Sequence, residues 1–325
     1  MAQWIETDEV WRRNQKMHQT EAIRLLANLL LLALLAGLPS RTCAADIQHQ
    51  KCFVNSIGAK LVRVPSGSFL KGSSFSEQTR DSWEGQPRRT TISKSFFLAE
   101  TETTQSQFAK IMSYNPSRFV SSCRPVENVS WKEAIKFCEL LTRLEQDKKR
   151  ITSNQKYSLP TEAQWEFACR AGSSTQFSTG KELPQKSSKF DYFGASRKVL
   201  GFSSHIIDRK RAAYYLEQKY GARAVSMLRH YWVGTAKVAS YEPNSFGLFD
   251  MHGNVWEWCL DRYEAVPNTN DNSASIHHAD SGLLRCIKGG SWDNYDFDCR
   301  SAKRRFFDSN YKCDNIGFRF VLVEE

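Results

Sequence analysis

The amino-acid sequence predicts an irregular α+β domain with short strands, few helices and much ordered loop. Three observations support this fold class. Capping-box patterns begin at Thr104, Ser130 and Thr161, and each precedes an apolar run with helical spacing. Short stretches that alternate apolar and polar residues predict strands before and after these helices. An aromatic-rich turn, residues 244–259 (NSFGLFDMHGNVWEWC), precedes the last of the predicted strands.

Residues 1–45 are predicted to be a signal peptide or an N-terminal anchor. Residues 25–38 (LLANLLLLALLAGL) form an apolar run that follows Arg24 and ends before Pro39. The run is short for a membrane span, and the small residues at 44 and 45 suit cleavage there. A polar segment precedes the run, so either translation begins at Met17 or the segment stays as an uncleaved anchor. We expect an exported protein that is periplasmic, secreted or on the cell surface, and membrane contact only through an uncleaved segment.

The composition suits a globular domain in residues 46–325. The chain of 325 residues is 41% hydrophobic and 12% aromatic, enough to bury a full core in one large domain or two small ones. Its net charge of +10 would suit an acidic partner or an anionic surface, but many exported proteins are simply basic, and we prefer that interpretation. No zinc finger, RNP-type strand or basic helix motif accompanies the charge, so we expect no nucleic-acid binding.

The cysteines agree with export. Eight of the nine cysteines remain when Cys43 is set aside with the N-terminal segment, and an even number suits an oxidising compartment. Their connectivity cannot be read from the spacing. No Cys-x-x-Cys pair is present, so neither a zinc site nor a thioredoxin-like motif is supported.

The first half of the domain is predicted to contain two strand regions and three helices. Residues 61–71 alternate around Pro-Ser-Gly and predict a β-hairpin, and residues 90–100 predict a second strand. A short helix follows Thr104. The helix after Ser130 is amphipathic and is expected to extend to about residue 145, and the helix after Thr161 is expected to stop at residue 172.

Residues 173–238 have the least defined pattern. They begin rich in Ser and Lys, and residues 209–228 have helical spacing with basic side chains. One interpretation is a basic helical arm for a partner or a membrane surface. We favour the other interpretation, a solvated helical excursion.

The aromatic-rich turn is predicted to be buried, because a surface loop could not leave that much ring area in water. Its glycines and asparagines allow the positive φ angles of tight turns. Asp250 and Glu257 bracket the turn, and their oxygens suit a hard cation such as calcium. The alternative is that both acids are merely solvated. After the turn, residues 266–282 are expected to be a loop whose paired histidines are incidental. The rest of the chain is expected to supply a strand, an irregular stretch and a final strand.

Several ordered motifs resemble the sulfatase-modifying-factor family, whose founding members are formylglycine-generating enzymes. The motifs are GNVWEW (253–258), LPTEAQWEFACRAG (159–172), KGGSW (288–292) with CRSAKR (299–304), IGFRF (316–320) and LVRVPSGSFLKGS (61–73). The resemblance implies a C-type-lectin-like fold with unusually little regular structure. It also marks residues 173–238 as an insertion that is atypical of the family.

The resemblance does not extend to the family's active site. Formylglycine-generating enzymes oxidise a substrate cysteine with copper held by two thiols, and the first of these falls on Asn294 here. Cys299 is followed by Arg-Ser-Ala, which aligns it with the family's later, disulfide-forming cysteine. A carboxamide cannot replace a thiolate as a soft copper ligand, so we expect no copper and no formylglycine-generating activity.

The tail between these motifs carries side chains suited to recognition. Its aromatic side chains supply contact area and its Asn and Asp side chains adaptable hydrogen bonds, as in a paratope. The tail also resembles the variable region of retroelement-diversified lectin-fold proteins; the alternative is ordinary surface loops. The predicted ligand-binding residues are Asn294, Tyr295, Phe297, Phe306, Phe307 and Tyr311.

The resemblance also implies a calcium site and a disulfide. Asp250 and Glu257 would supply side-chain oxygens to a structural calcium, and Gly253 and Val255 backbone carbonyls. The implied disulfide joins Cys169 to Cys299. A second family bridge would begin at Cys138, but its partner position holds Phe320.

Two functions follow. The chain is an exported binding protein whose C-terminal loops take a protein or small-molecule ligand, or it is a divergent metal-dependent oxidase or maturation enzyme of the same superfamily. Bound copper or iron would favour the second.

Overall fold

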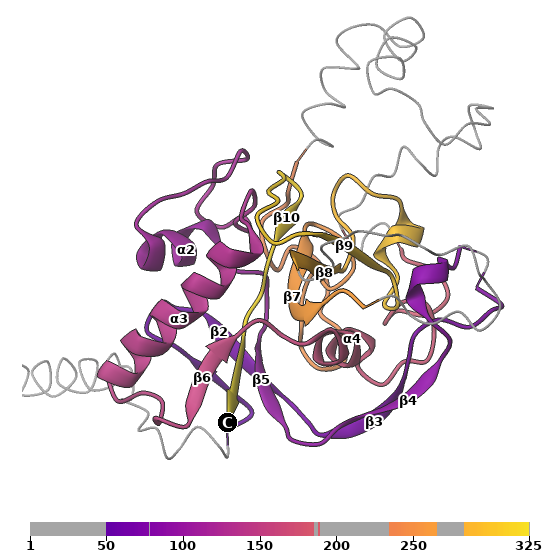
Figure 1. Ribbon diagram of the computed structural model, residues 1–325, viewed down its shortest axis with the longest axis horizontal. Helices are drawn as coiled ribbons and strands as arrows, with labels where there is room; N and C mark the ends of the chain where they lie inside the picture. Colours follow the sequence, from indigo (N-terminus) through magenta and orange to yellow (C-terminus); the bar gives the residue numbers. More distant parts are fainter. Residues whose placement is uncertain (1–49, 78, 185–187, 189–233, 265–282, 325) are drawn as a thin grey trace, which may run out of the picture. The chain divides into compact units, whose positions relative to one another are not determined.

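The structure is a computed structural model that describes residues 50–77, 79–184, 188, 234–264 and 283–324. The chain divides into two units, 1–42 and 43–325, and all described residues belong to the second. These residues form three α-helices, eleven strands and two short 3-10 helices (Figure 1). No helix in the described ranges has both the length and the apolar character to cross a bilayer. The expected signal peptide or anchor lies outside them.

A five-stranded antiparallel sheet organises the half of the domain that carries α3. Its strands, in spatial order, are β1 (Cys52–Val54), β2 (Lys60–Val64), β5 (Phe96–Ala99), β11 (Val321–Glu324) and β6 (Gln155–Ser158). The strand nearest the end of the chain, β11, is therefore inserted between β5 and β6.

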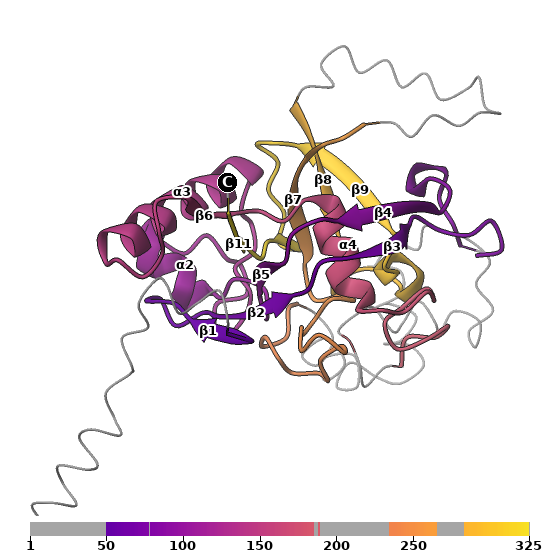
Figure 2. The same ribbon diagram turned by 90° about the horizontal axis from the view of Figure 1, so that it is seen from below.

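The predicted hairpin at residues 61–71 is wrong in its pairing. Both strands are present, but β2 pairs with β5, and β3 (Gly67–Lys71) pairs with β4 (Arg88–Ile92). Pro65 lies between β2 and β3 and has no N–H to donate, so it interrupts the ladder without reversing the chain. The two segments run on as one long ribbon (Figure 2). The single strand predicted at 90–100 is correspondingly divided into β4 and β5.

The three predicted helices are present and begin where the capping boxes place them. They are α2 (Gln105–Met112), α3 (Trp131–Asp147) and α4 (Glu162–Arg170). In each, the N-cap hydroxyl accepts the N3 backbone N–H at 3.1–3.2 Å, and the N3 side chain accepts the N-cap N–H in return. Helix α4 ends at Ala171 and Gly172, which both have positive φ, as a glycine-assisted C-terminus requires.

A four-stranded sheet carries the second half of the domain. Its order is β10 (Ile316–Gly317), β7 (Trp256–Arg262), β8 (Leu284–Lys288) and β9 (Arg304–Asp308), with β10 and β7 parallel. Strand β9 and the 3-10 helix η5 (Asp296–Cys299) lie in the tail that was expected to be irregular. The aromatic-rich turn leads directly into β7.

Two buried clusters hold these elements together. One lies between α2, α3 and the five-stranded sheet and includes Phe108, Phe137 and Phe318, whose rings pack at 5.2–6.2 Å. The other surrounds Trp165 of α4. This helix contacts β3, β4, β7 and β8. Short strands, few helices and long ordered connections confirm the predicted irregular α+β class. The segments predicted at 209–228 and 266–282 lie outside the described residues.

Candidate functional site

The KGGSW motif forms a tight turn at the end of β8. Gly289 and Gly290 have φ angles of +99° and +74°, which favour glycine. A Cβ at Gly290 would lie 2.5 Å from Cys299 Sγ, so the turn needs glycine there to pack against η5. Ser291 is fully buried behind this turn.

Asn294, the position expected for the family's first active thiol, is held as a structural hydrogen-bond acceptor. Its Oδ1 accepts the indole N–H of Trp256 at 2.7 Å and the hydroxyl of Ser291 at 2.5 Å. Its backbone N–H donates to Ser291 O at 3.0 Å. Trp256 and Ser291 are buried, so the carboxamide closes a polar pocket in which a thiol would leave the indole N–H without a good acceptor.

Aromatic and guanidinium groups surround Asn294 on the η5 side. The rings of Tyr295 and Phe297 stack at 5.1 Å, and both are partly exposed. The Arg305 guanidinium lies 5.6 Å from the Trp256 ring and pairs with Asp298 at 3.1 Å. Arg305 is 45% exposed, so this cation can be reached from solvent.

The loop that follows α2 packs against Trp292, two residues before Asn294. The ring of Phe119 packs edge-on against Trp292 at 5.3 Å, and Trp292 donates its indole N–H to Asp314 O at 3.1 Å. Arg118 forms an ion pair with Asp314 and remains 67% exposed. Val120 is 76% exposed at the same loop. We call Phe119, Val120, Tyr295, Phe297 and Arg305 the rim.

The remaining predicted ligand-binding residues lie elsewhere. Phe306 and Phe307 are consecutive in β9 and therefore point to opposite faces of the sheet. Phe306 packs on Tyr263 at 3.8 Å and on Trp83 at 5.7 Å. Phe307 stacks on Tyr311 at 4.5 Å. The six predicted residues thus form three separate groups: Asn294 with Tyr295 and Phe297, Phe306 alone, and Phe307 with Tyr311.

The two cysteines of the implied disulfide lie around one histidine. Cys169 and Cys299 are both fully buried and carry free thiols in the structure. The Cys169 sulfur lies 3.8 Å from both ring nitrogens of His252, and His252 Nδ1 donates to Cys299 O at 2.8 Å. Ser178 N–H donates to Nε2 at 3.0 Å, which leaves the ring neutral with its proton on Nδ1.

Burial keeps both thiols and the imidazole of this group uncharged in the folded state. Burial raises the pKa of Cys169 to about 12 and also raises the pKa of Cys299, so neither is a thiolate near neutral pH. Burial lowers the pKa of His252 to about 4, so it does not form an ion pair with a thiolate. The implied disulfide stays a prediction, and the shared histidine is compatible with it.

The implied calcium ligands fit a cation only in part. Both oxygens of Glu257 accept from Arg319, at 2.7 and 2.8 Å, and Oε2 also accepts the Trp165 indole N–H at 2.7 Å. Arg319 is fully buried as well, and its guanidinium supplies the positive charge that pairs with this carboxylate. Asp250 Oδ2 accepts Ala239 N–H at 2.7 Å, but its Oδ1 is buried with no hydrogen-bond partner.

Sequence reasoning missed Glu102 beside this turn. Glu102 is fully buried, its Oε1 accepts from the Asn254 side chain at 3.0 Å, and its Oε2 has no hydrogen-bond partner. Burial and the Asp250 charge raise the pKa of Glu102 well above its ordinary value, and burial raises the pKa of Asp250 to about 6. The two unpartnered oxygens thus belong to Asp250 and Glu102, whose side chains also interact with each other; a cation or a proton shared by the two carboxyl groups would satisfy them. An acid two residues before the N-cap Thr104 was the only signal in the sequence.

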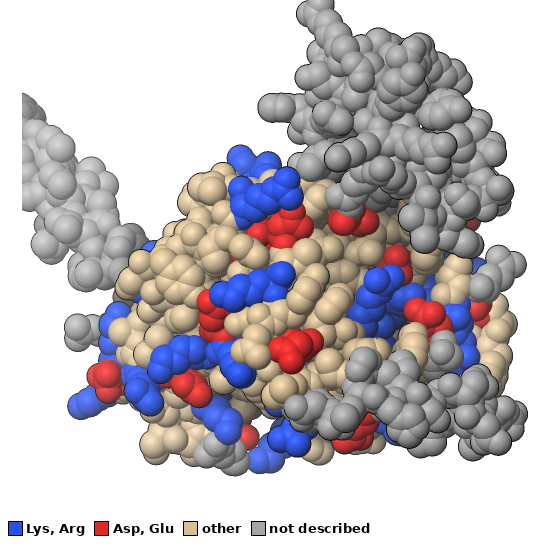
Figure 3. Space-filling view, turned by 45° about the horizontal axis from the view of Figure 1, so that its top comes forward, with Lys and Arg blue, Asp and Glu red and all other residues tan. Residues whose placement is uncertain are grey.

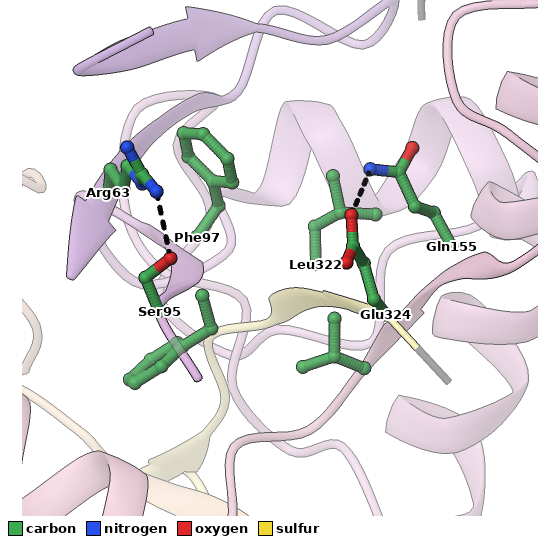
Figure 4. Close-up of a pocket in the computed structure, with 8 residues that line it drawn as sticks. Arg63, Ser95, Phe97, Gln155, Leu322 and Glu324 are labelled. Carbon is green, nitrogen blue, oxygen red and sulfur yellow. Dashed lines mark hydrogen bonds between the residues drawn. The ribbon is translucent and has the colours of Figure 1, made fainter. Parts of the chain in front are cut away.

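Clustered metal-ligating side chains are absent from the described residues, both at the rim and at the aromatic-rich turn. Within the part of the chain that the structure describes, no group of three or more His, Cys, Asp or Glu side chains is arranged to hold a metal ion. A pocket of about 210 Å³ opens at the end of the five-stranded sheet, between Arg63 and Glu324 with Phe97 as part of its lining (Figure 4). None of the predicted site residues lines it.

Charge on the face in Figure 3 is mixed. Lys and Arg side chains are interspersed there with Asp and Glu. Recognition on that face would therefore depend on individual pairs more than on a field of one sign.

Comparisons with known proteins agree with the motifs. "Chaperone protein LppX" of Paenibacillus barcinonensis is 27% identical over 90% of this chain and 96% of its own length. The formylglycine-generating enzyme of Mus musculus is 28% identical over 61% of this chain, which spans only 44% of that enzyme. The solved structure of Treponema denticola variable protein 1 has 23% identity and a TM-score of 0.56, and it covers 83% of this chain and 98% of its own.

The model of the sulfatase-modifying factor enzyme 1-like domain matches residues 50–323, nearly the whole domain. Together with the GNVWEW turn, the GGSW turn and the three capped helices, this match shows that the chain belongs to the sulfatase-modifying-factor family.

Proposed function

We propose that this domain is a binding module for a polypeptide and not a formylglycine-generating oxidase, and that it works in an exported protein. The observation that carries the proposal is the state of Asn294. Its oxygen accepts hydrogen bonds from Trp256 and Ser291. The side chain at the position expected for the first active thiol therefore supports the rim.

The rim supplies the chemistry for binding. Tyr295, Phe297 and Phe119 are partly exposed rings set on rigid neighbours, and Val120 and Arg305 are exposed beside them. Aromatic and Arg side chains held in fixed positions are the side chains that most often dominate the free energy of protein association. Because Tyr295 and Phe297 already stack on each other and Phe119 already packs on Trp292, little side-chain entropy is lost on binding.

A polypeptide ligand is favoured over a small molecule by the relative LppX, which is named a chaperone and matches this chain over almost its full length. The rim is also built from three separated segments and projects exposed side chains, which suits an extended partner. The small pocket at Arg63 lies away from these residues and is not part of the proposal.

Suppression of aggregation tests this function. The purified chain is added to a chemically unfolded model protein, and light scattering is followed for the wild type and for Tyr295→Ser/Phe297→Ser. We expect the wild type to delay aggregation and the double variant to lose most of that effect. Phe75→Ser is the matched control, because Phe75 is a 68% exposed ring outside the rim.

Two outcomes would contradict the proposal. One is a wild-type chain that leaves aggregation unchanged at tenfold molar excess. The other is stoichiometric copper or iron in the purified protein together with oxidation of a cysteine-containing peptide, which would establish the divergent oxidase instead.

A further inference from the structure

Two buried cysteines outside the site lie on neighbouring strands. Strands β7 and β8 are antiparallel, with Trp258 opposite Ile287. The next pair along the strands is Arg262 with Arg285, so Cys259 is the first residue of a three-residue bulge, 259–261, that lies opposite Cys286. Opposite residues of an antiparallel pair, such as Trp258 and Ile287, have Cα atoms about 4.5–5.5 Å apart. Cys259 and Cys286 directly adjoin that pair, and a disulfide spans Cα separations of about 4.4–6.8 Å.

The two side chains also point to the same side of the sheet. Trp258 and Ile287 both pack in the cluster under α3, so the next residue on each strand faces the other way. Cys259 and Cys286 accordingly both pack in the cluster around Trp165 of α4, and both are fully buried.

We propose that Cys259 and Cys286 form a disulfide in the mature protein, separate from the family-type pair. Each cysteine loses its S–H bond and one S–S bond forms. The two electrons and two protons pass to a disulfide oxidant of the compartment, which is released as a dithiol.

Arg304 identifies the attacking sulfur. Its Nη2 donates to Cys286 Sγ at 3.1 Å, and this guanidinium favours the thiolate of Cys286. In the completed fold, burial outweighs this effect and raises the pKa of Cys286 to about 11. Burial and then neighbouring acids raise the pKa of Cys259, and Cys286 is also among the groups that raise it.

The bond therefore forms before α4 covers the two strands. Once both thiols are buried and protonated, an external oxidant neither reaches them nor finds a thiolate. The bridge then fixes β7 to β8 at the bulge. This is the strand pair whose other end holds Trp256 and the GGSW turn.

Peptide mapping of the full chain, exported into an oxidising compartment, tests the bond. The unreduced protein is denatured, alkylated and digested, and we expect a linked peptide that contains Cys259 and Cys286. Recovery of the two as alkylated free thiols, or linked to other cysteines, would overturn the proposal. A sample that is reduced before alkylation, in which every cysteine must carry the label, reports whether alkylation was complete.

Thiol counting in denaturant separates a bond from two packed thiols. In Cys259→Ala a bonded Cys286 is released, so the number of reactive thiols rises by one relative to the wild type. If the two are unbonded, the same variant loses one thiol. We also expect Cys259→Ala, Cys286→Ala and the double variant to lower Tm by the same amount, roughly 5–10 °C. Additive losses would contradict the bond.

Discussion

At the scale of single residues, Asn294 stands where the family's first active thiol is expected and serves as a hydrogen-bond acceptor for buried donors. Its oxygen satisfies two buried donors, the Trp256 indole N–H and the Ser291 hydroxyl. A buried donor that loses its acceptor costs about 1–3 kcal/mol, whereas removing both partners costs much less. The stability of the rim therefore depends on a pair of residues and not on either one alone.

A double-mutant cycle tests this pairing. We expect Asn294→Ala to lower the free energy of unfolding by about 1–3 kcal/mol, because Trp256 is left with an unpaired N–H. In a Trp256→Phe background the same change should cost clearly less, since that donor is gone. Urea unfolding measures both. Equal losses in the two backgrounds would show that the hydrogen bond contributes little.

A second residue links stability to pH. Glu127 is fully buried; its Oε1 accepts Phe119 N–H at 2.8 Å, and its Oε2 has no hydrogen-bond partner. Burial raises the pKa of Glu127 to about 7, and the nearby Asp314 adds to the rise while Arg118 opposes it. The folded state thus favours the protonated acid. The stability from this preference is present below pH 4.5 and is lost as the pH rises through 7.

The variant Glu127→Gln isolates this effect. Glutamine keeps an acceptor for Phe119 but does not ionise. We expect the wild type to lose about 1–3 kcal/mol of stability relative to Glu127→Gln between pH 5 and pH 8. Urea unfolding at several pH values measures the difference. Parallel pH profiles would show that Glu127 titrates normally.

At the scale of elements, the sequence predicted helices better than strand pairing. A helix is specified locally, by a cap and an apolar stripe, so the starts at Thr104, Ser130 and Thr161 were correct. Strand partners are chosen over distance. Residues 61–71 carried a turn signal, yet Pro65 only interrupts a ribbon whose partner lies beyond residue 87.

The candidate site was predictable only where motifs anchored it. The GGSW and CRSA motifs located Asn294, but composition grouped six tail residues that β9 separates, because alternation along a strand sends Phe306 and Phe307 to opposite faces. Phe119 and Val120 come from a loop far away in sequence, and no local pattern connects them to the tail. Glu102 was missed for the same reason.

The aromatic-rich turn carries the calcium prediction. We expect a bound calcium to raise stability by about 2.7 kcal/mol at a hundredfold excess over Kd, and EDTA to remove this gain. Asp250→Ala and Glu102→Gln should both weaken the response to EDTA, and the exposed Glu242→Ala should not. If EDTA leaves the wild-type Tm unchanged, Arg319 alone neutralises the turn and no calcium is present.

Helix α4 and the tail carry the disulfide prediction. We expect unreduced peptide maps to contain a Cys169–Cys299 peptide, because these buried cysteines both lie against His252. Reduction should then lower Tm, since the bridge closes a loop of more than a hundred residues worth up to about 4–5 kcal/mol. Recovery of either cysteine as a free thiol under the same conditions contradicts the pairing.

At the scale of the whole molecule, the fold class and the family are established, and export is the property that remains to be measured. We expect N-terminal sequencing of the exported protein to begin after residue 44 or 45, because small residues follow the apolar run there. Recovery of residues 1–45 intact in the membrane fraction would identify an anchor. Intact protein confined to the cytosol would contradict export.

The insertion of β11 between β5 and β6 has a consequence for biosynthesis. Both neighbours are made more than 160 positions before residue 321, and neither side of the gap can close until β11 arrives. During translation the sheet remains incomplete and its aromatic side chains have no stable core. A nascent chain that cannot fold early stays loosely structured, which is the state that a secretion channel can thread. For the export that we expect, this topology would keep the sheet open until β11 has been made.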